Sequence, residues 1–227
     1  MDLEHKSNLQ NHLVTWSEWH ALAMLVGVWT ILVFLPIGYF SPWALASFTT
    51  LIVCCRPFWT PNQTFGFANT ITGFRLVGIL VLLMFANIPN EWVIIASIFI
   101  LILDGVDGYV ARKTNLESEF GEYFDKEVDA LFMLTLCLLL FTKSQFGLWI
   151  LIPGSFRYLF VLYIKFSNPT VYKEYQSPFS KWIFSFTMST LIFDFTSFHN
   201  IAFFLTLGIT LLLGFSFLVS IIRLHRS

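Results

Sequence analysis

Long apolar stretches, one after another, limit most what this chain can fold into. A helix needs about 20 mostly apolar residues to cross a lipid bilayer. The stretches near that length are Trp19–Phe40, Ala68–Ala86, Trp92–Val110, Phe124–Phe141, Leu148–Phe166, Trp182–Ser197 and Ile201–Ile222. The chain is 56% hydrophobic and 12% charged, whereas an average soluble domain is about 25% charged. We therefore expect an all-α, polytopic integral membrane protein.

Residues 1–67 fit this pattern less regularly. Residues 1–18 are polar and mixed in charge, and they lack the order of charged and apolar residues that is typical of a signal peptide. The apolar piece Trp43–Cys55 has 13 residues and fits either a short span or a re-entrant piece. We expect a turn near 41–43, and an extra membrane element of one or two hydrophobic helices over residues 19–67.

Lysine and arginine residues gather on one side of the predicted membrane. If the end of the 92–110 stretch faces the cytoplasm, the basic residues on that side are Arg56, Arg75, Arg112, Lys113, Lys126, Lys165, Lys173, Lys181, Arg223 and Arg226. Lys143 lies on the other side, and Arg157 falls within a span. Basic residues favour the cytoplasmic side. We therefore expect this side to face the cytoplasm, in a bacterial inner membrane.

Charge and cysteine content argue against two further classes of protein. The net charge is −1, so nothing indicates a nucleic acid partner. The three cysteines lie within or beside apolar stretches and show neither a disulfide framework nor the spacing of a metal site. We expect them to be small buried hydrophobic residues.

Four aspartates interrupt the apolar pattern at the predicted cytoplasmic edge. Asp104 and Asp107 are three residues apart, and Asp125 and Asp129 are four apart, so each pair shares a helical face. Neighbouring antiparallel helices can bring the four carboxylates together, where they repel strongly unless a cation lies among them. Oxygen ligands without His or Cys select Mg²⁺, Mn²⁺ or Ca²⁺. Four carboxylates can hold two such ions, an arrangement that suits phosphoryl transfer.

These acids also allow two other interpretations. A single aspartate near a helix end is usually a cap, but four on two facing surfaces do not fit that explanation. Acids within a membrane are costly and indicate function, and a divalent-cation transporter would also use them. A transporter predicts acids near the middle of the membrane, whereas these lie at one edge.

The residues from Asp104 to Asp129 form the pattern D-x2-D-G-x2-A-R-x8-G-x3-D-x3-D. Every residue and spacing resembles the motif of the CDP-alcohol phosphatidyltransferase family. A second stretch, NTITGFR from Asn69 to Arg75, resembles the N-x2-T-x2-R that opens the first core span of that family. The resemblance implies a core of six spans, which we assign to residues 68–227, with residues 1–67 outside it.

The resemblance implies that CDP-diacylglycerol donates its phosphatidyl group to an alcohol, and that CMP leaves. It implies that Asp104, Asp107, Asp125 and Asp129 bind two ions, Mg²⁺ or Mn²⁺, and that Asp129 also accepts the alcohol proton. The residues implied to contact or make room for the CDP group are Asn69, Thr70, Ile71, Thr72, Gly108, Ala111, Arg112, Ser118 and Gly121.

The acceptor alcohol differs among members of the family. In this sequence, only the basic residues indicate which kind of alcohol could be bound. A phosphorylated alcohol needs a basic pocket, for which Arg157 is the best candidate because a charge within a span is expensive. The further candidates for acceptor binding are Arg75, Lys165, Lys173 and Lys181. Glu127 lies between two motif aspartates and points off their face, so we expect it at the membrane interface.

Three alternatives accompany the expected reaction. Within the family, the donor can instead be a CDP-alcohol and the acceptor diacylglycerol. Outside this activity, the chain could be a cation transporter or an inactive homologue, although an inactive homologue should have lost a motif residue and none is missing. The expected partners are CDP-diacylglycerol, a small alcohol and membrane lipids, and the resemblance also suggests a homodimer.

Overall fold

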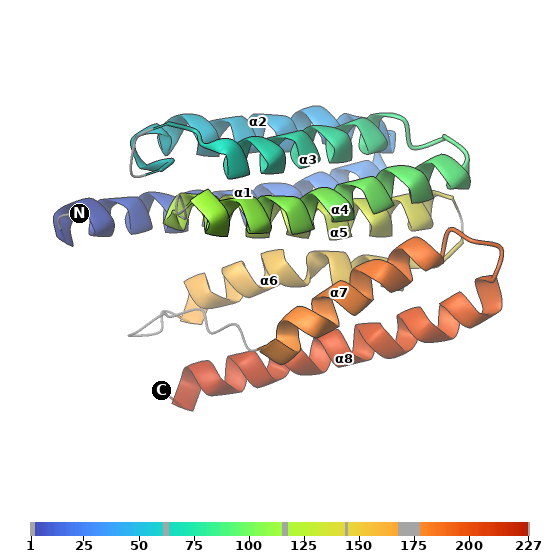
Figure 1. Ribbon diagram of the computed structural model, residues 1–227. Coiled ribbons are helices and arrows are strands. Elements are labelled where there is room, and N and C mark those ends of the chain that lie inside the picture. The colour runs from blue at the N-terminus through green and yellow to red at the C-terminus, as the bar shows by residue number, and fades with distance from the viewer. Residues whose placement is uncertain (1–2, 61–63, 115–117, 144, 168–177, 227) are drawn as a thin grey trace.

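The computed structural model describes residues 3–60, 64–114, 118–143, 145–167 and 178–226 (Figure 1). The helices are α1 (Leu3–Val33), α2 (Phe40–Cys54), α3 (Phe67–Met84), α4 (Asn90–Thr114), α5 (Glu119–Thr142), α6 (Leu151–Ser167), α7 (Pro178–Phe193) and α8 (His199–Arg226). Short 3₁₀ helices, namely η1 (Ile37–Tyr39), η2 (Arg56–Phe58) and η3 (Leu148–Ile150), adjoin α2 and α6. The described ranges contain no strand, so the all-α prediction is confirmed.

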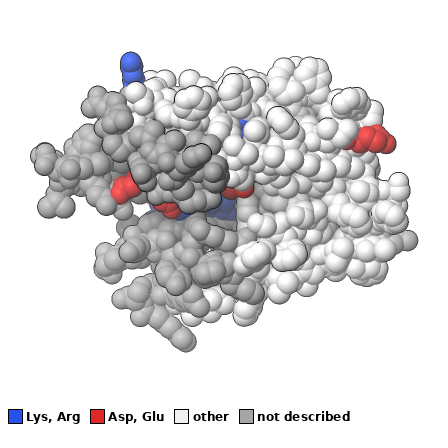
Figure 2. Space-filling model, in the orientation of Figure 1, with Lys and Arg blue, Asp and Glu red and all other residues white. Residues whose placement is uncertain are grey.

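The outside of the helix bundle is apolar enough to face lipid. Trp29, Phe74 and Phe204 are 64%, 68% and 72% exposed, which water would disfavour and lipid would not. On the face drawn in Figure 2, the surface away from the grey atoms is almost entirely white, apart from an acidic patch at the far end. The described stretches that are long and apolar enough to cross a membrane are His12–Val33, Ile37–Cys54, Phe67–Met84, Leu148–Ser167 and Ile201–Val219. The protein is therefore an integral membrane protein, as predicted.

The first span differs from the predicted Trp19–Phe40. α1 ends at Val33, and Pro36 follows in an extended conformation, with φ −61° and ψ 146°. A proline has no N–H to donate and disfavours helix in the residue before it, so the break falls here. The turn predicted near 41–43 is wrong, because Pro42 lies in the first turn of α2, where backbone N–H groups have no partner within the helix.

The short apolar piece Trp43–Cys55 belongs to a longer helical stretch. Ile37–Cys54 has 18 residues, which is long enough to cross the bilayer. α2 packs against both α1 and α3, and it buries Phe40, Ala44, Phe48 and Leu51 at intervals of three or four residues. The element before the predicted core therefore contains two hydrophobic helices rather than one.

The described helices run alternately up and down. Both ends of the chain therefore lie at the same end of the bundle. Figure 1 shows the N-terminus, the last turns of α4 and the C-terminus at the same end. We call this the site end, because the motif aspartates lie in α4 and α5 where these helices meet it.

α5 is the central helix of the bundle. All residues from Ala130 to Leu140 are buried, and α5 packs against α3 on one side and α6 on the other. A helix that is apolar all round belongs in the interior. This central position fixes the aspartates in the first half of α5 relative to both neighbours.

Gly154 allows α5 and α6 to approach closely. A Cβ atom added to Gly154 would lie 2.8 Å from Leu134 Cα and 3.2 Å from Cys137 Sγ. We expect Gly154→Ala to lower the free energy of unfolding by about 1–3 kcal/mol, because the backbone of α5 must shift. Thermal unfolding in detergent measures the effect. Gly208→Ala in α8 is the matched control, because its Cβ would meet nothing within 4 Å; equal stability of both variants would contradict the prediction.

Candidate active site

Three consecutive helices of the core supply the aspartates and one arginine. α4 carries Asp104, α5 carries Asp125 and Asp129 one turn apart, and α3 carries Arg75. The start of α5 is fixed by Ser118, whose hydroxyl oxygen accepts a hydrogen bond from the Gly121 N–H at 3.0 Å. Because this cap fixes where the helix begins, it also fixes the face on which the two aspartates lie.

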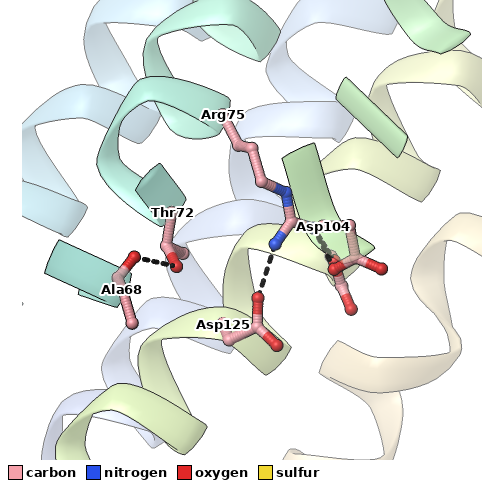
Figure 3. Close-up of polar contacts among 6 residues, drawn as sticks. Ala68, Thr72, Arg75, Asp104 and Asp125 are labelled. Atoms are coloured by element: carbon pink, nitrogen blue, oxygen red, sulfur yellow. Dashed lines mark hydrogen bonds and ion pairs between the residues drawn. The ribbon is translucent and has the colours of Figure 1, made fainter. Parts of the chain in front are cut away.

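The Arg75 guanidinium lies among three of the motif carboxylates and is only 1% exposed. Its Nη1 donates to Asp125 Oδ1 at 2.6 Å, and its Nη2 lies 2.8 Å from Asp104 Oδ1 and contacts Asp129 Oδ1 as well. Figure 3 shows the side chain reaching from α3 towards Asp104 and Asp125. The repulsion expected among these carboxylates requires a cation, and Arg75 supplies one positive charge against three negative charges.

The same three carboxylates form a group that fits a metal ion. Asp104, Asp125 and Asp129 each offer one ligand oxygen, and these oxygens lie within 4.8 Å of one another. The carboxylates are half-buried, with Asp104 and Asp125 each 38% exposed and Asp129 21%. A set of hard oxygen ligands open to water on one side suits Mg²⁺ or Mn²⁺. The structure thus brings together three of the four predicted metal ligands.

Residues predicted to contact the CDP group meet beside the aspartates, around the backbone carbonyl of Trp59. Asn69 Nδ2 donates to this carbonyl at 3.2 Å, and the Ser118 hydroxyl donates to it at 2.7 Å. A Cβ atom on Gly121 would lie 2.7 Å from Asn69 Oδ1, so only glycine leaves room for the amide here. Asn69, Ser118 and Gly121 are therefore assembled in one place.

The neighbouring positions on α3 have local contacts. Thr72 is buried and its hydroxyl donates to the Ala68 carbonyl at 3.2 Å, while the exposed Thr70 donates to Gly66 at 2.8 Å. Ile71 is half-buried. Gly66, which precedes α3, has φ +78°, a left-handed conformation that favours glycine. This turn orients the first turn of α3 towards Ser118 and Gly121.

Several predicted residues lie outside what the structure describes. The backbone of α4 continues to Thr114, but the side chains of Asp107, Ala111 and Arg112, and the surroundings of Gly108, are outside the described set. Lys173 and the side chain of Lys181 are outside it too.

Arg157 forms an ion pair with Glu127. Its Nε and Nη2 lie 3.1 and 2.8 Å from Glu127 Oε1, and the two side chains are 18% and 1% exposed. Glu127 is two residues from both Asp125 and Asp129, so it lies on the opposite face of α5. The expectation that Glu127 lies at the interface is wrong, and the structure brings Arg157 to this face rather than to the aspartates.

Lys165, another candidate for acceptor binding, is engaged by the N-terminal helix. Its Nζ lies 2.8 Å from Glu18 Oε2 and 5.5 Å from the centre of the Trp19 ring. The contact joins α6 to α1, so this lysine connects the core to the added element.

Three features were missed in the sequence. The central position of Arg75 could have been suspected, because it belongs to the same motif stretch as Asn69 and Thr72 on α3. The Glu127–Arg157 pair had a stronger signal, since opposite charges within two predicted neighbouring spans are expected to meet. The Trp59 carbonyl is a backbone group outside the motif, and nothing in its residue type indicated a role.

A family model described as CDP-alcohol phosphatidyltransferase matches residues 65–222. The chain is similar to the "CDP-diacylglycerol--glycerol-3-phosphate 3-phosphatidyltransferase" of Pseudomonas fluorescens, with 29% identity over 38% of this chain and 46% of the relative. It is also similar to "Choline/ethanolaminephosphotransferase 1" of Arabidopsis thaliana, with 35% identity over 41% of this chain and 26% of the relative. The matched regions thus span less than half of these curated relatives, and the helices α1 and α2 precede the range matched by the family model.

Proposed function

The chain belongs to the CDP-alcohol phosphatidyltransferase family, and we propose that it transfers a phosphatidyl group from CDP-diacylglycerol to a small alcohol, with release of CMP. The observation that carries this proposal is the group formed by Asp104, Asp125 and Asp129 at one end of a membrane bundle. A lipid donor can keep its acyl chains in the bilayer there while its CDP group and the alcohol meet at the water edge.

The metal-binding residues in this proposal are Asp104, Asp107, Asp125 and Asp129, which would hold two divalent ions, Mg²⁺ or Mn²⁺. Bound ions would stabilise the charge on the phosphate oxygens and polarise the alcohol. Asp129 accepts the hydroxyl proton as the alcohol oxygen bonds to the phosphatidyl phosphorus, because an alcohol is a poor nucleophile at neutral pH. The bond from that phosphorus to CMP breaks, and CMP leaves with the electron pair.

The donor-binding residues in this proposal surround the start of α5. Asn69, Ser118 and Gly121 are in contact with one another or with the same carbonyl, which supports a common role. The remaining members of the proposed set are Thr70, Ile71, Thr72, Gly108, Ala111 and Arg112.

The names of the two relatives refer to different alcohols. The Pseudomonas relative is named for glycerol 3-phosphate, whereas the Arabidopsis relative is named for choline and ethanolamine. The roles of Arg157, Lys165, Lys173 and Lys181 in acceptor binding stay predictions, and so do the homodimer and the cytoplasmic, bacterial orientation. The similarity to the Arabidopsis protein also supports the second candidate, transfer from a CDP-alcohol to diacylglycerol.

Release of CMP by the purified full chain in detergent tests the proposal. We expect release to require CDP-diacylglycerol, Mg²⁺ or Mn²⁺, and one alcohol of a panel: glycerol 3-phosphate, inositol phosphate, inositol, serine or choline. A parallel reaction contains CDP-choline and diacylglycerol. Release in that reaction alone would replace the first candidate by the second. Absence of release in both, with no binding of CDP-diacylglycerol, would contradict transferase activity.

A further inference from the structure

Arg75 contacts the same carboxylates that would hold the metal. Its two terminal nitrogens contact the Oδ1 atoms of Asp104 on α4 and of Asp125 and Asp129 on α5. The side chain is 1% exposed, so its charge is compensated mainly by these acids. A planar guanidinium with several fixed donors is suited to hold carboxylates in this way.

A divalent ion and this guanidinium are electrostatic competitors. An ion bound to three carboxylate oxygens that lie within 4.8 Å of one another is necessarily close to the nitrogens that already contact those residues. Like charges at such short range repel, and water screens this repulsion only partly because the carboxylates are half-buried. Because the ion carries the higher charge, we expect it to displace the guanidinium from these carboxylates.

We propose that Arg75 is a built-in counter-ion of the metal site, which a divalent ion displaces from the carboxylates. This inference rests on the proposed function for the identity of the ion, and it places Arg75 at the metal site in place of the predicted contact with the acceptor. Once displaced, the guanidinium can contact a phosphate group of the donor.

The position of Arg75 on α3 supports the second half of this exchange. Thr72 lies three residues before it and Asn69 six residues before it, and both side chains are buried like that of Arg75. Asn69 contacts Gly121 and the carbonyl that Ser118 also contacts. A guanidinium that turns away from the aspartates along α3 moves towards the group proposed to bind the donor.

Binding of Mn²⁺ to the full chain without substrates, followed by electron paramagnetic resonance, tests the exchange. We expect Arg75→Gln to bind Mn²⁺ about tenfold more tightly than the unaltered protein, because the competitor is gone. Arg75→Lys keeps the charge but loses the planar guanidinium with its several donors. Its Mn²⁺ affinity should lie between those of Arg75→Gln and the unaltered protein. Arg56→Gln is the matched control: Arg56 is exposed in η2 after α2, and its removal should change affinity less than twofold.

The same exchange predicts the opposite effect on the donor. With Mn²⁺ saturating, Arg75→Gln should bind CDP-diacylglycerol at least about tenfold more weakly, because a phosphate contact is lost. A merely structural role would weaken the binding of both metal and donor. Opposite changes therefore support the exchange, and equal or weaker Mn²⁺ binding by Arg75→Gln overturns it.

A measurement on the unaltered protein decides the question if Arg75→Gln does not fold. Arginine side-chain ¹⁵N signals, assigned with Arg75→Lys, should move for Arg75 when Mg²⁺ is added; an unmoved signal while Mg²⁺ binds overturns the exchange. Failure of the exchange leaves the proposed function intact when the unaltered protein binds Mn²⁺ and releases CMP. If the unaltered protein binds no divalent ion at all, both the exchange and the metal-dependent function fail.

Discussion

Asp129→Asn should lower CMP release by at least about a thousandfold, the largest effect that we expect from one substitution. Asparagine cannot accept the alcohol proton, and loss of a positioned base alone costs about two to four orders of magnitude. Asp129 is also one of the three carboxylates that fit a metal, so the substitution weakens the ion site as well. The measurement is the initial rate of CMP release at saturating CDP-diacylglycerol and alcohol.

A comparison with Asp125→Asn separates the two roles of Asp129. Asp125 lies one turn earlier on the same face and is proposed only as a metal ligand, so a higher Mn²⁺ concentration should restore much of its rate. The same concentration should not restore Asp129→Asn. Glu122→Gln is the control for loss of charge, because Glu122 is 68% exposed and pairs with Lys126 on the surface; its rate should stay within twofold. Full metal rescue of Asp129→Asn would contradict the role as base.

Glu127→Ala should lower the free energy of unfolding by about 3–5 kcal/mol, which is the usual cost of removing one partner of a buried ion pair. Glu127 is 1% exposed and accepts both hydrogen bonds from Arg157 on a single oxygen. Without that carboxylate, the largely buried guanidinium loses its ion pair with Glu127. Thermal unfolding in detergent should therefore show a clearly lower midpoint.

The double variant Glu127→Leu with Arg157→Met distinguishes a lost charge pair from a lost shape. Replacing a buried pair by apolar residues of similar volume is often neutral or stabilising. We expect the double variant to unfold close to the unaltered protein, and Glu127→Ala to unfold well below both. If the double variant is as unstable as the single one, packing rather than charge explains the effect. Retained CMP release in the double variant would also remove Arg157 from the list of acceptor-binding residues.

The parts of the fold that follow from local spacing could be predicted. Asp125 and Asp129 share a face because they are four residues apart on a helix, and the alternation of apolar stretches and short connections indicated the number of core spans. Pro36 lies inside an apolar run, so a prediction from apolar length alone makes the first span too long. The rule that a proline ends a helix would have placed the break correctly.

The parts that depend on how far side chains reach could not be predicted. Arg75 is separated from Asp104 and Asp125 by 29 and 50 residues, and its type fits a contact with a substrate as well as a contact with an acid. Only the packing of α3 against α4 and α5 selects the acids. Similarly, helical spacing shows that Glu127 does not share a face with the aspartates, but it does not show that Arg157 on α6 is its partner.

The position of the aspartates at a single end of the bundle has a consequence for the bilayer itself. Donor and product of the proposed reaction both keep their acyl chains in the leaflet at the site end, and CMP returns to the water on that side. Each product molecule therefore begins in one leaflet only. A membrane that depends on this protein for new phospholipid would expand unevenly, so it needs a separate route that moves lipids to the opposite leaflet.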